Sequence, residues 1–116
     1  MMLVVGGRGA GKRAFAMEYL GLADEDFSRS AEGEEPAVYD AQELARGGFD
    51  EALVEALASK RVVIADEVGS GVVPASEEER KWRDDAGLLC QELAKRADVV
   101  VRVICGVPQT IKGELA

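Results

Sequence analysis

The residues best suited to chemistry lie near the start of the chain, in Gly6-Gly7-Arg8-Gly9-Ala10-Gly11-Lys12-Arg13. They have the spacing Gly-x-x-x-x-Gly-Lys and directly follow a short apolar run, Met2 to Val5. Glycines let successive backbone N–H groups curl around phosphate oxygens, and a following helix adds its positive N-terminal end. The pattern therefore predicts a phosphate-binding loop at residues 6–13, with Lys12 reaching the terminal phosphates as a catalytic cation.

One position of this loop departs from the usual pattern. Such loops normally end in Ser or Thr, whose hydroxyl binds Mg²⁺, whereas this chain has Arg13. Arginine cannot coordinate a cation, so magnesium must be held by another residue or be absent, and Arg13 is a candidate phosphate partner. The alternative interpretation is a glycine-rich turn with an exposed lysine. A dinucleotide-binding loop is disfavoured because Gly-x-Gly-x-x-Gly cannot be drawn through these glycines.

A second candidate site is the acidic pair Asp66-Glu67, which follows the apolar run Val62 to Ala65. Acidic residues at the C-terminal end of a parallel strand lie where open α/β sheets bind ligands. Asp66 is a candidate ligand of hydrated magnesium, and Glu67 is a candidate catalytic residue that positions or deprotonates a nucleophile. The alternative is that both carboxylates begin a solvated turn. Arg80, Arg83 and Asp84 form a third polar set, for which composition favours a solvated helix face.

These candidates require strands that alternate with helices. Strands are expected at residues 2–5, 37–39, 62–65 and 99–104, and helices after Gly11, from Ala41 to Gly47, after Asp50, and from Ser76 to about Arg96. Asp40 with Glu43 and Ser76 with Glu79 have capping-box spacing, residues 24–35 are expected to form an acidic loop, and residues 69–74 a turn. The pattern indicates one α/β domain, residues 1–116, with a parallel sheet.

Composition excludes several classes of function. With 14 Lys and Arg against 22 Asp and Glu, the net charge is -8, which disfavours binding to nucleic acid or to a membrane surface. The sequence contains no histidine, which excludes histidine triads and most zinc sites. Cys90 and Cys105 have no metal-site spacing and are interpreted as buried thiols. Without a signal peptide or an apolar membrane span, we expect a cytoplasmic protein, and the modest core favours a homo-oligomer.

Several motifs in the second half of the chain occur together in one known family. They are Glu67 to Pro74, Arg80-Lys81-Trp82-Arg83-Asp84, Gly87, Gln91, Ala97-Asp98-Val99 and Gly106 to Lys112. With the Gly6-Gly7 opening, they resemble the bifunctional adenosylcobinamide kinase/adenosylcobinamide-phosphate guanylyltransferase family of cobalamin biosynthesis. The resemblance implies a P-loop NTPase fold of the RecA-like type, with a parallel sheet of about four strands flanked by helices. It also implies GTP or ATP as nucleotide, Mg²⁺, a cobinamide acceptor and an oligomer.

The sequence departs from that family in three places. The family transfers GMP through a histidine, and this chain has none, so we expect no guanylyl transfer by that route. The family has an additional helix and strand where residues 40–60 run almost directly into Val62, and its loop ends in Ser rather than Arg13. The sequence therefore predicts a P-loop protein that binds GTP or ATP in cobalamin biosynthesis, with a non-catalytic nucleotide-binding regulator, or a subunit completed by another chain, as the alternative.

Overall fold

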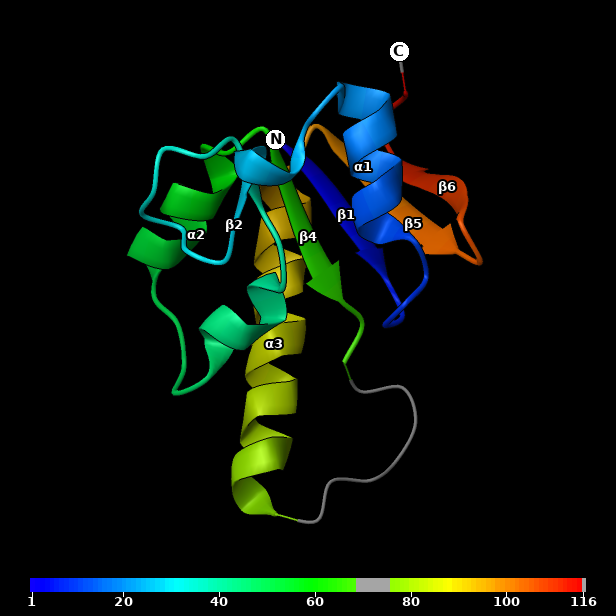
Figure 1. Cartoon of the computed structure of the whole chain (residues 1–116). Coiled ribbons are helices and arrows are strands. Elements are labelled where there is room, and N and C mark those ends of the chain that lie inside the picture. The colour runs from blue at the N-terminus through cyan, green and yellow to red at the C-terminus, as the bar shows by residue number, and fades with distance from the viewer. Residues whose placement is uncertain (69–75, 116) are drawn as a thin grey trace.

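The structure is a computed structural model that describes residues 1–68 and 76–115. These residues form one six-stranded sheet with three α-helices and two short 3-10 helices (Figure 1). The strands are β1 Met2–Gly6, β2 Phe27–Ser28, β3 Ala37–Val38, β4 Val62–Asp66, β5 Val99–Ile104 and β6 Val107–Lys112. The helices are α1 Lys12–Leu20, α2 Glu51–Ala58 and α3 Glu77–Arg96, and the 3-10 helices are Asp24–Asp26 and Ala41–Ala45.

The strand order is β2-β3-β4-β1-β5-β6. Each pair from β2 to β5 is parallel, and β6 pairs with β5 in the antiparallel direction. The apolar composition of β1 and β4 follows from this arrangement, because central parallel strands are covered on both faces. The predicted α/β class with a mainly parallel sheet is confirmed.

The sheet has two strands that the sequence did not predict. β2 lies inside the acidic stretch expected to be a loop, and it forms because Phe27 is buried at 9% exposure. β6 returns from β5 through Cys105 and Gly106, whose positive φ angles of 50° and 77° suit a two-residue hairpin turn. All six β6 residues are exposed, so the burial pattern that identifies a strand is missing there.

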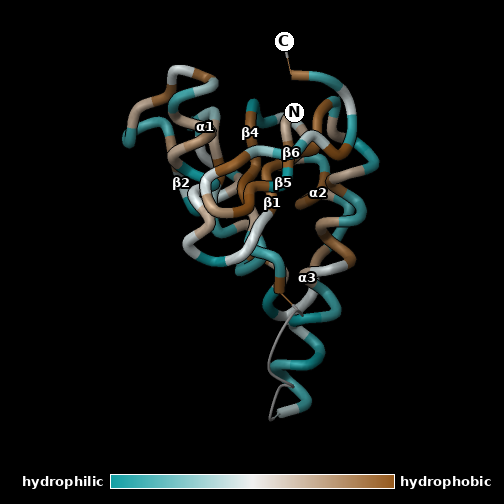
Figure 2. The backbone as a smooth tube through the Cα atoms, turned by 90° about the vertical axis from the view of Figure 1, so that its right-hand side faces the viewer, coloured by the Kyte–Doolittle hydropathy of each residue, from teal (hydrophilic) through white to brown (hydrophobic). Residues whose placement is uncertain are grey.

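Helices cover both faces of the sheet. α1 packs on one face, over a core that includes Met2, Val4, Ile64 and Val101. α2, α3 and the 3-10 helix Ala41–Ala45 pack on the other face, over a second and larger core. Figure 2 shows the hydrophobic colour concentrated in the strands, and a hydrophilic α3 end that extends beyond the carboxyl edge of the sheet.

The helix starts test the predicted caps. The Asp50 carboxylate accepts a hydrogen bond from the Leu53 amide, and the Ser76 hydroxyl accepts one from the Glu79 amide. The capping box predicted at Asp40 is wrong, because Asp40 has a left-handed conformation with φ 53° and makes no side-chain cap. Its carboxylate pairs with Arg29 instead, and only a 3-10 helix follows.

The turn predicted at residues 69–74 lies outside the described residues. Across residues 1–68 and 76–115, no helix is both long enough and apolar enough to cross a membrane.

Candidate functional site

The predicted phosphate-binding loop lies at the carboxyl edge of the sheet. The loop begins after Gly6 at the end of β1 and leads into α1. A tight bend is held by the Ala10 amide, which donates to the Gly7 carbonyl at 3.1 Å. Gly9 and Gly11 have φ angles of 75° and 97°, which side chains rarely adopt. Gly7, Arg8 and Gly9 are exposed to solvent, so the backbone of this bend is open to a ligand.

The N-terminus of α1 carries neither a capping side chain nor an acidic residue. Gly11 precedes the helix and supplies no side-chain cap, so the first N–H groups of α1 have no acceptor from a capping residue. The first two helical residues are Lys12 and Arg13, and no acidic residue lies in this turn. Positive side chains beside the positive end of a helix dipole are unfavourable unless negative charges lie nearby, and here Asp66 pairs with Lys12 and Asp24 with Arg13.

Lys12 is buried, with 6% of its surface exposed. Its Nζ donates to the Gly7 carbonyl at 2.7 Å and lies 2.8 Å from Asp66 Oδ1. An ammonium group has three N–H donors, so these two contacts leave one for a ligand. The alternative of a glycine-rich turn with a solvent-exposed lysine is therefore wrong for this residue.

Asp66 is held beside the loop by its neighbours on the sheet. It ends β4 opposite Gly6 of β1, and its amide donates to Gln42 Oε1 at 2.8 Å. Gln42 is 4% exposed, and its backbone carbonyl accepts from Trp82 Nε1 at 2.8 Å. The sequence did not single out Gln42, because a lone glutamine gives no local signal that its amide will fix a strand end 24 residues away.

Glu67 lies on the other face of the sheet from Lys12. Successive residues of an extended chain point to opposite faces, so the carboxylates of Asp66 and Glu67 diverge. Glu67 forms a bidentate ion pair with Arg102, at 2.7 and 3.0 Å. Burial and the nearby Glu67 carboxylate raise the pKa of Cys90, a residue of α3, to about 11. The structure therefore does not bring the predicted acidic pair together around one ligand.

Arg13 makes its side-chain contacts with the segment that carries β2 and β3. Its guanidinium lies between the Phe27 and Tyr39 rings, at 4.7 and 4.6 Å from their centroids, and pairs with Asp24 at 3.2 Å. Its Nε is buried there without a hydrogen-bond partner. Arg13 thus ties α1 to the segment that carries β2 and β3, while it also lines the cavity beside Lys12.

A cavity of about 370 Å³ opens beside Lys12 and Asp66, and Gly11, Arg13 and Asp40 also line it. Proteins hold Mg²⁺ through one or two carboxylates together with substrate phosphates and water. Asp66 fits that requirement, and among the residues that the structure describes no group of three or more His, Cys, Asp or Glu side chains could hold a metal ion. The donor set therefore suits a metal that arrives with a phosphate ligand.

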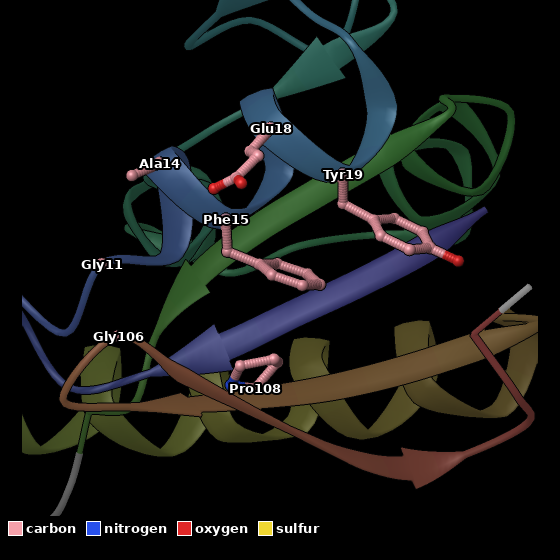
Figure 3. Close-up of a pocket in the computed structure, with 7 residues that line it drawn as sticks. All are labelled: Gly11, Ala14, Phe15, Glu18, Tyr19, Gly106 and Pro108. Atoms are coloured by element: carbon pink, nitrogen blue, oxygen red, sulfur yellow. The ribbon is translucent and has the colours of Figure 1, made fainter.

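Two further cavities adjoin the same edge of the sheet. One of about 570 Å³ lies between α1 and the β5–β6 turn, where Phe15, Tyr19 and Pro108 line it (Figure 3). The other, of about 590 Å³, lies on the opposite face beside α3, and Arg83 and Asp84 line it. Asp84 is exposed and Arg83 is half-buried, which agrees with the expected solvated helix face. Within this helix, Lys81 pairs with Asp85 and Lys95 with Glu92.

The fold and the loop define an α/β protein of the P-loop NTPase class. Residues 49–111 match the family model described as cobinamide kinase / cobinamide phosphate guanyltransferase, and the chain belongs to this family. The chain is 39% identical over 70 residues to the bifunctional adenosylcobalamin biosynthesis protein CobP of Pseudomonas aeruginosa, a match that covers 58% of this chain and 40% of that protein. It is 43% identical over 54 residues to the bifunctional adenosylcobalamin biosynthesis protein CobU of Escherichia coli, covering 47% of this chain and 30% of the relative.

These matches are confined to part of each protein. The chain matches well under half of the length of either curated relative. The family match begins at residue 49, so it does not include the glycine loop or Lys12. Family membership and the geometry of the loop are therefore two independent observations.

Proposed function

We propose that this chain binds the phosphates of GTP or ATP on residues 6–13 and serves in cobalamin biosynthesis. The observation that carries the proposal is Lys12, an ammonium group buried behind a glycine loop with a donor left for a ligand. Burying a charged lysine costs free energy of folding unless the charge has a partner. Here Asp66 supplies one partner, and a phosphate would supply the second.

The uncapped N-terminus of α1 supports the same ligand. Its N–H groups, which no side chain caps, and its dipole favour a group with several negative oxygens, and a nucleotide phosphate is such a group. The overall negative charge of the chain disfavours a polyanion that needs a broad basic surface. A compact phosphate on one loop avoids that repulsion.

Asp66 is the residue we propose for Mg²⁺. When bound, the metal would neutralise charge between the carboxylate and the phosphates. With the metal bound, Asp66 would be its ligand, and Lys12 would hold the phosphate. We expect nucleotide affinity to increase with magnesium for this reason.

The pathway role rests on the family. The curated relatives are named as bifunctional adenosylcobalamin biosynthesis proteins, and we infer that this chain acts in the same pathway. We do not extend the proposal to guanylyl transfer through a histidine, because the sequence contains none.

A non-catalytic role is the second candidate, and two contacts favour it. Glu67, the expected catalytic carboxylate, is held by Arg102 away from Lys12. Arg13 replaces the expected hydroxyl and is engaged with Phe27 and Tyr39. A regulator, or a subunit completed by another chain, needs the phosphate loop without these groups.

Calorimetric titration with GTP and ATP tests the binding proposal. We expect micromolar binding that Lys12→Met weakens by at least about tenfold, because one charged hydrogen bond to phosphate is lost. Lys95→Met is the matched control, since Lys95 is exposed at the end of α3 and pairs with Glu92. Nucleotide binding that survives Lys12→Met would refute the assignment of the loop.

Transfer of a labelled γ-phosphate to cobinamide separates the two candidates. Label in cobinamide that depends on Lys12 would establish a kinase. Nucleotide binding without any transfer, in the presence of magnesium and cobinamide, would favour the non-catalytic role.

A further inference from the structure

The cavity between α1 and the β5–β6 turn shares its rim with the phosphate loop. Gly11, which precedes α1, lines both this cavity and the smaller one beside Lys12. The turn is fixed against the loop, because the Gly106 amide donates to the Ala10 carbonyl at 2.7 Å. A ligand whose phosphates lie on the loop can therefore extend into this cavity without leaving the protein surface.

The walls of the cavity suit a flat aromatic ring. Phe15 and Tyr19 stack on each other, with centroids 5.6 Å apart and planes inclined by 11°. Figure 3 shows both rings projecting from α1 toward the side where Pro108 lies. The cavity volume of about 570 Å³ is within the range for small-molecule sites. Aromatic side chains beside an open cavity are the usual platform for a nucleobase.

Glu18 gives the cavity a chemical preference. Among the described residues that line the cavity it is the one charged side chain, and Figure 3 shows it on α1 with Phe15 and Tyr19. A carboxylate only accepts hydrogen bonds. Guanine presents two adjacent donors, N1–H and the 2-amino group, whereas adenine has an acceptor at N1. One carboxylate can therefore accept two bonds from guanine and at most one from that edge of adenine.

Resting on the proposed function, we propose that this cavity holds the base of the bound nucleotide and that Glu18 makes the site prefer guanine. Phe15 and Tyr19 provide the stacking surface, and the Gly106 turn forms the opposite side. The nucleotide would then pass over Gly11, which the two cavities share. Its base would lie in the cavity beside Phe15 and Tyr19, and its phosphates would lie on the loop beside Lys12.

Calorimetry with three ligands tests this inference: GTP, ATP and inorganic tripolyphosphate, each with magnesium. We expect tripolyphosphate to bind, and GTP to bind at least about tenfold more tightly, because base stacking adds affinity. Tyr19→Leu should remove most of that advantage without changing the affinity for tripolyphosphate. Glu18→Gln should abolish the preference for GTP over ATP, and Glu55→Gln on α2 is the matched control.

The outcomes distinguish this inference from the proposed function. If tripolyphosphate and both nucleotides fail to bind, the phosphate site is refuted and the base site with it. If tripolyphosphate binds as tightly as GTP, the phosphate site stands and the base site is refuted. A preference for GTP that persists in Glu18→Gln would refute the role of Glu18.

Discussion

Lys12 Nζ lies 2.8 Å from Asp66 Oδ1, although 54 positions separate the two residues in the chain. β1 and β4 create this contact, because their register places Gly6 beside Asp66 at the edge where the loop begins. Lys12 is 6% exposed and Asp66 22%. The pair is therefore a preformed charge arrangement next to the proposed phosphate site.

Asp66→Asn should alter the response to magnesium. Without the metal, the carboxylate repels phosphate, so we expect its removal to tighten nucleotide binding by about fivefold, or about 1 kcal/mol. With the metal, the variant should gain little further affinity, because the proposed ligand is missing. Calorimetry with and without magnesium measures both effects.

Glu67→Gln is the adjacent control for this variant. It removes the same charge, but from a side chain paired with Arg102 on the opposite face. We expect its magnesium dependence to equal that of the unaltered protein. If Asp66→Asn and Glu67→Gln changed the magnesium dependence equally, that result would contradict the division of the two carboxylates between the faces.

Arg13→Ser should lower stability rather than restore function. The substitution removes the contacts of the guanidinium with Phe27, Tyr39 and Asp24. We expect a loss of about 1 to 2 kcal/mol in the free energy of unfolding, since each cation–π contact contributes about 0.5 to 1 kcal/mol. Urea unfolding measures this loss. Arg13→Lys should recover little of it, because lysine lacks the planar group that stacks.

Gly6→Ala tests the approach of the loop to β5. A Cβ on Gly6 would lie 2.5 Å from the Val103 carbonyl oxygen, which is a backbone atom that cannot easily move. We expect a destabilisation of about 1 to 3 kcal/mol in urea unfolding. Gly7→Ala, where an added Cβ meets nothing within 4 Å, should leave the midpoint nearly unchanged. Similar losses in both variants would contradict this packing.

Cys90 and Cys105 should differ in reactivity. Cys105 is exposed at the β5–β6 turn, whereas burial and Glu67 raise the pKa of Cys90 from 9.0 to about 11. At pH 8, iodoacetamide should modify Cys105 well before Cys90, as peptide mass spectrometry would show. The raised pKa also means that the stability contributed by the neutral Cys90 thiol is present below pH 9.0 and is lost toward pH 11. Faster modification of Cys90 would refute its burial.

The sequence predicted those parts of the fold that have strong local signals. The apolar runs of β1, β4 and β5, the Asp50 and Ser76 caps, and the Gly21 end of α1 are all confirmed. β2 and β6 were missed because one is a two-residue strand fixed by Phe27 and the other is an exposed edge strand. The capping box at Asp40 was wrong because Asp40 has a left-handed conformation and makes no side-chain cap.

In the candidate site, too, only residues with a local sequence signal were predicted. Lys12 and Asp66 were each recognisable from their neighbours in the chain, and the parallel sheet brings them together. The partners of Glu67 and Arg13 were not predictable, because Arg102, Phe27 and Tyr39 reach them only through tertiary packing. The expectation of two buried thiols was wrong for Cys105, which is exposed, whereas Cys90 is partly buried.

The most direct test of phosphate binding by residues 6–13 is a ¹H–¹⁵N correlation spectrum of the protein titrated with tripolyphosphate and magnesium. If residues 6–13 bind phosphate, the amide resonances of Gly9, Gly11, Lys12 and Arg13 should shift strongly and saturate together, while those of α2 stay in place. Shifts confined to the α3 face, or no saturable shift at these amides, would contradict phosphate binding by the loop.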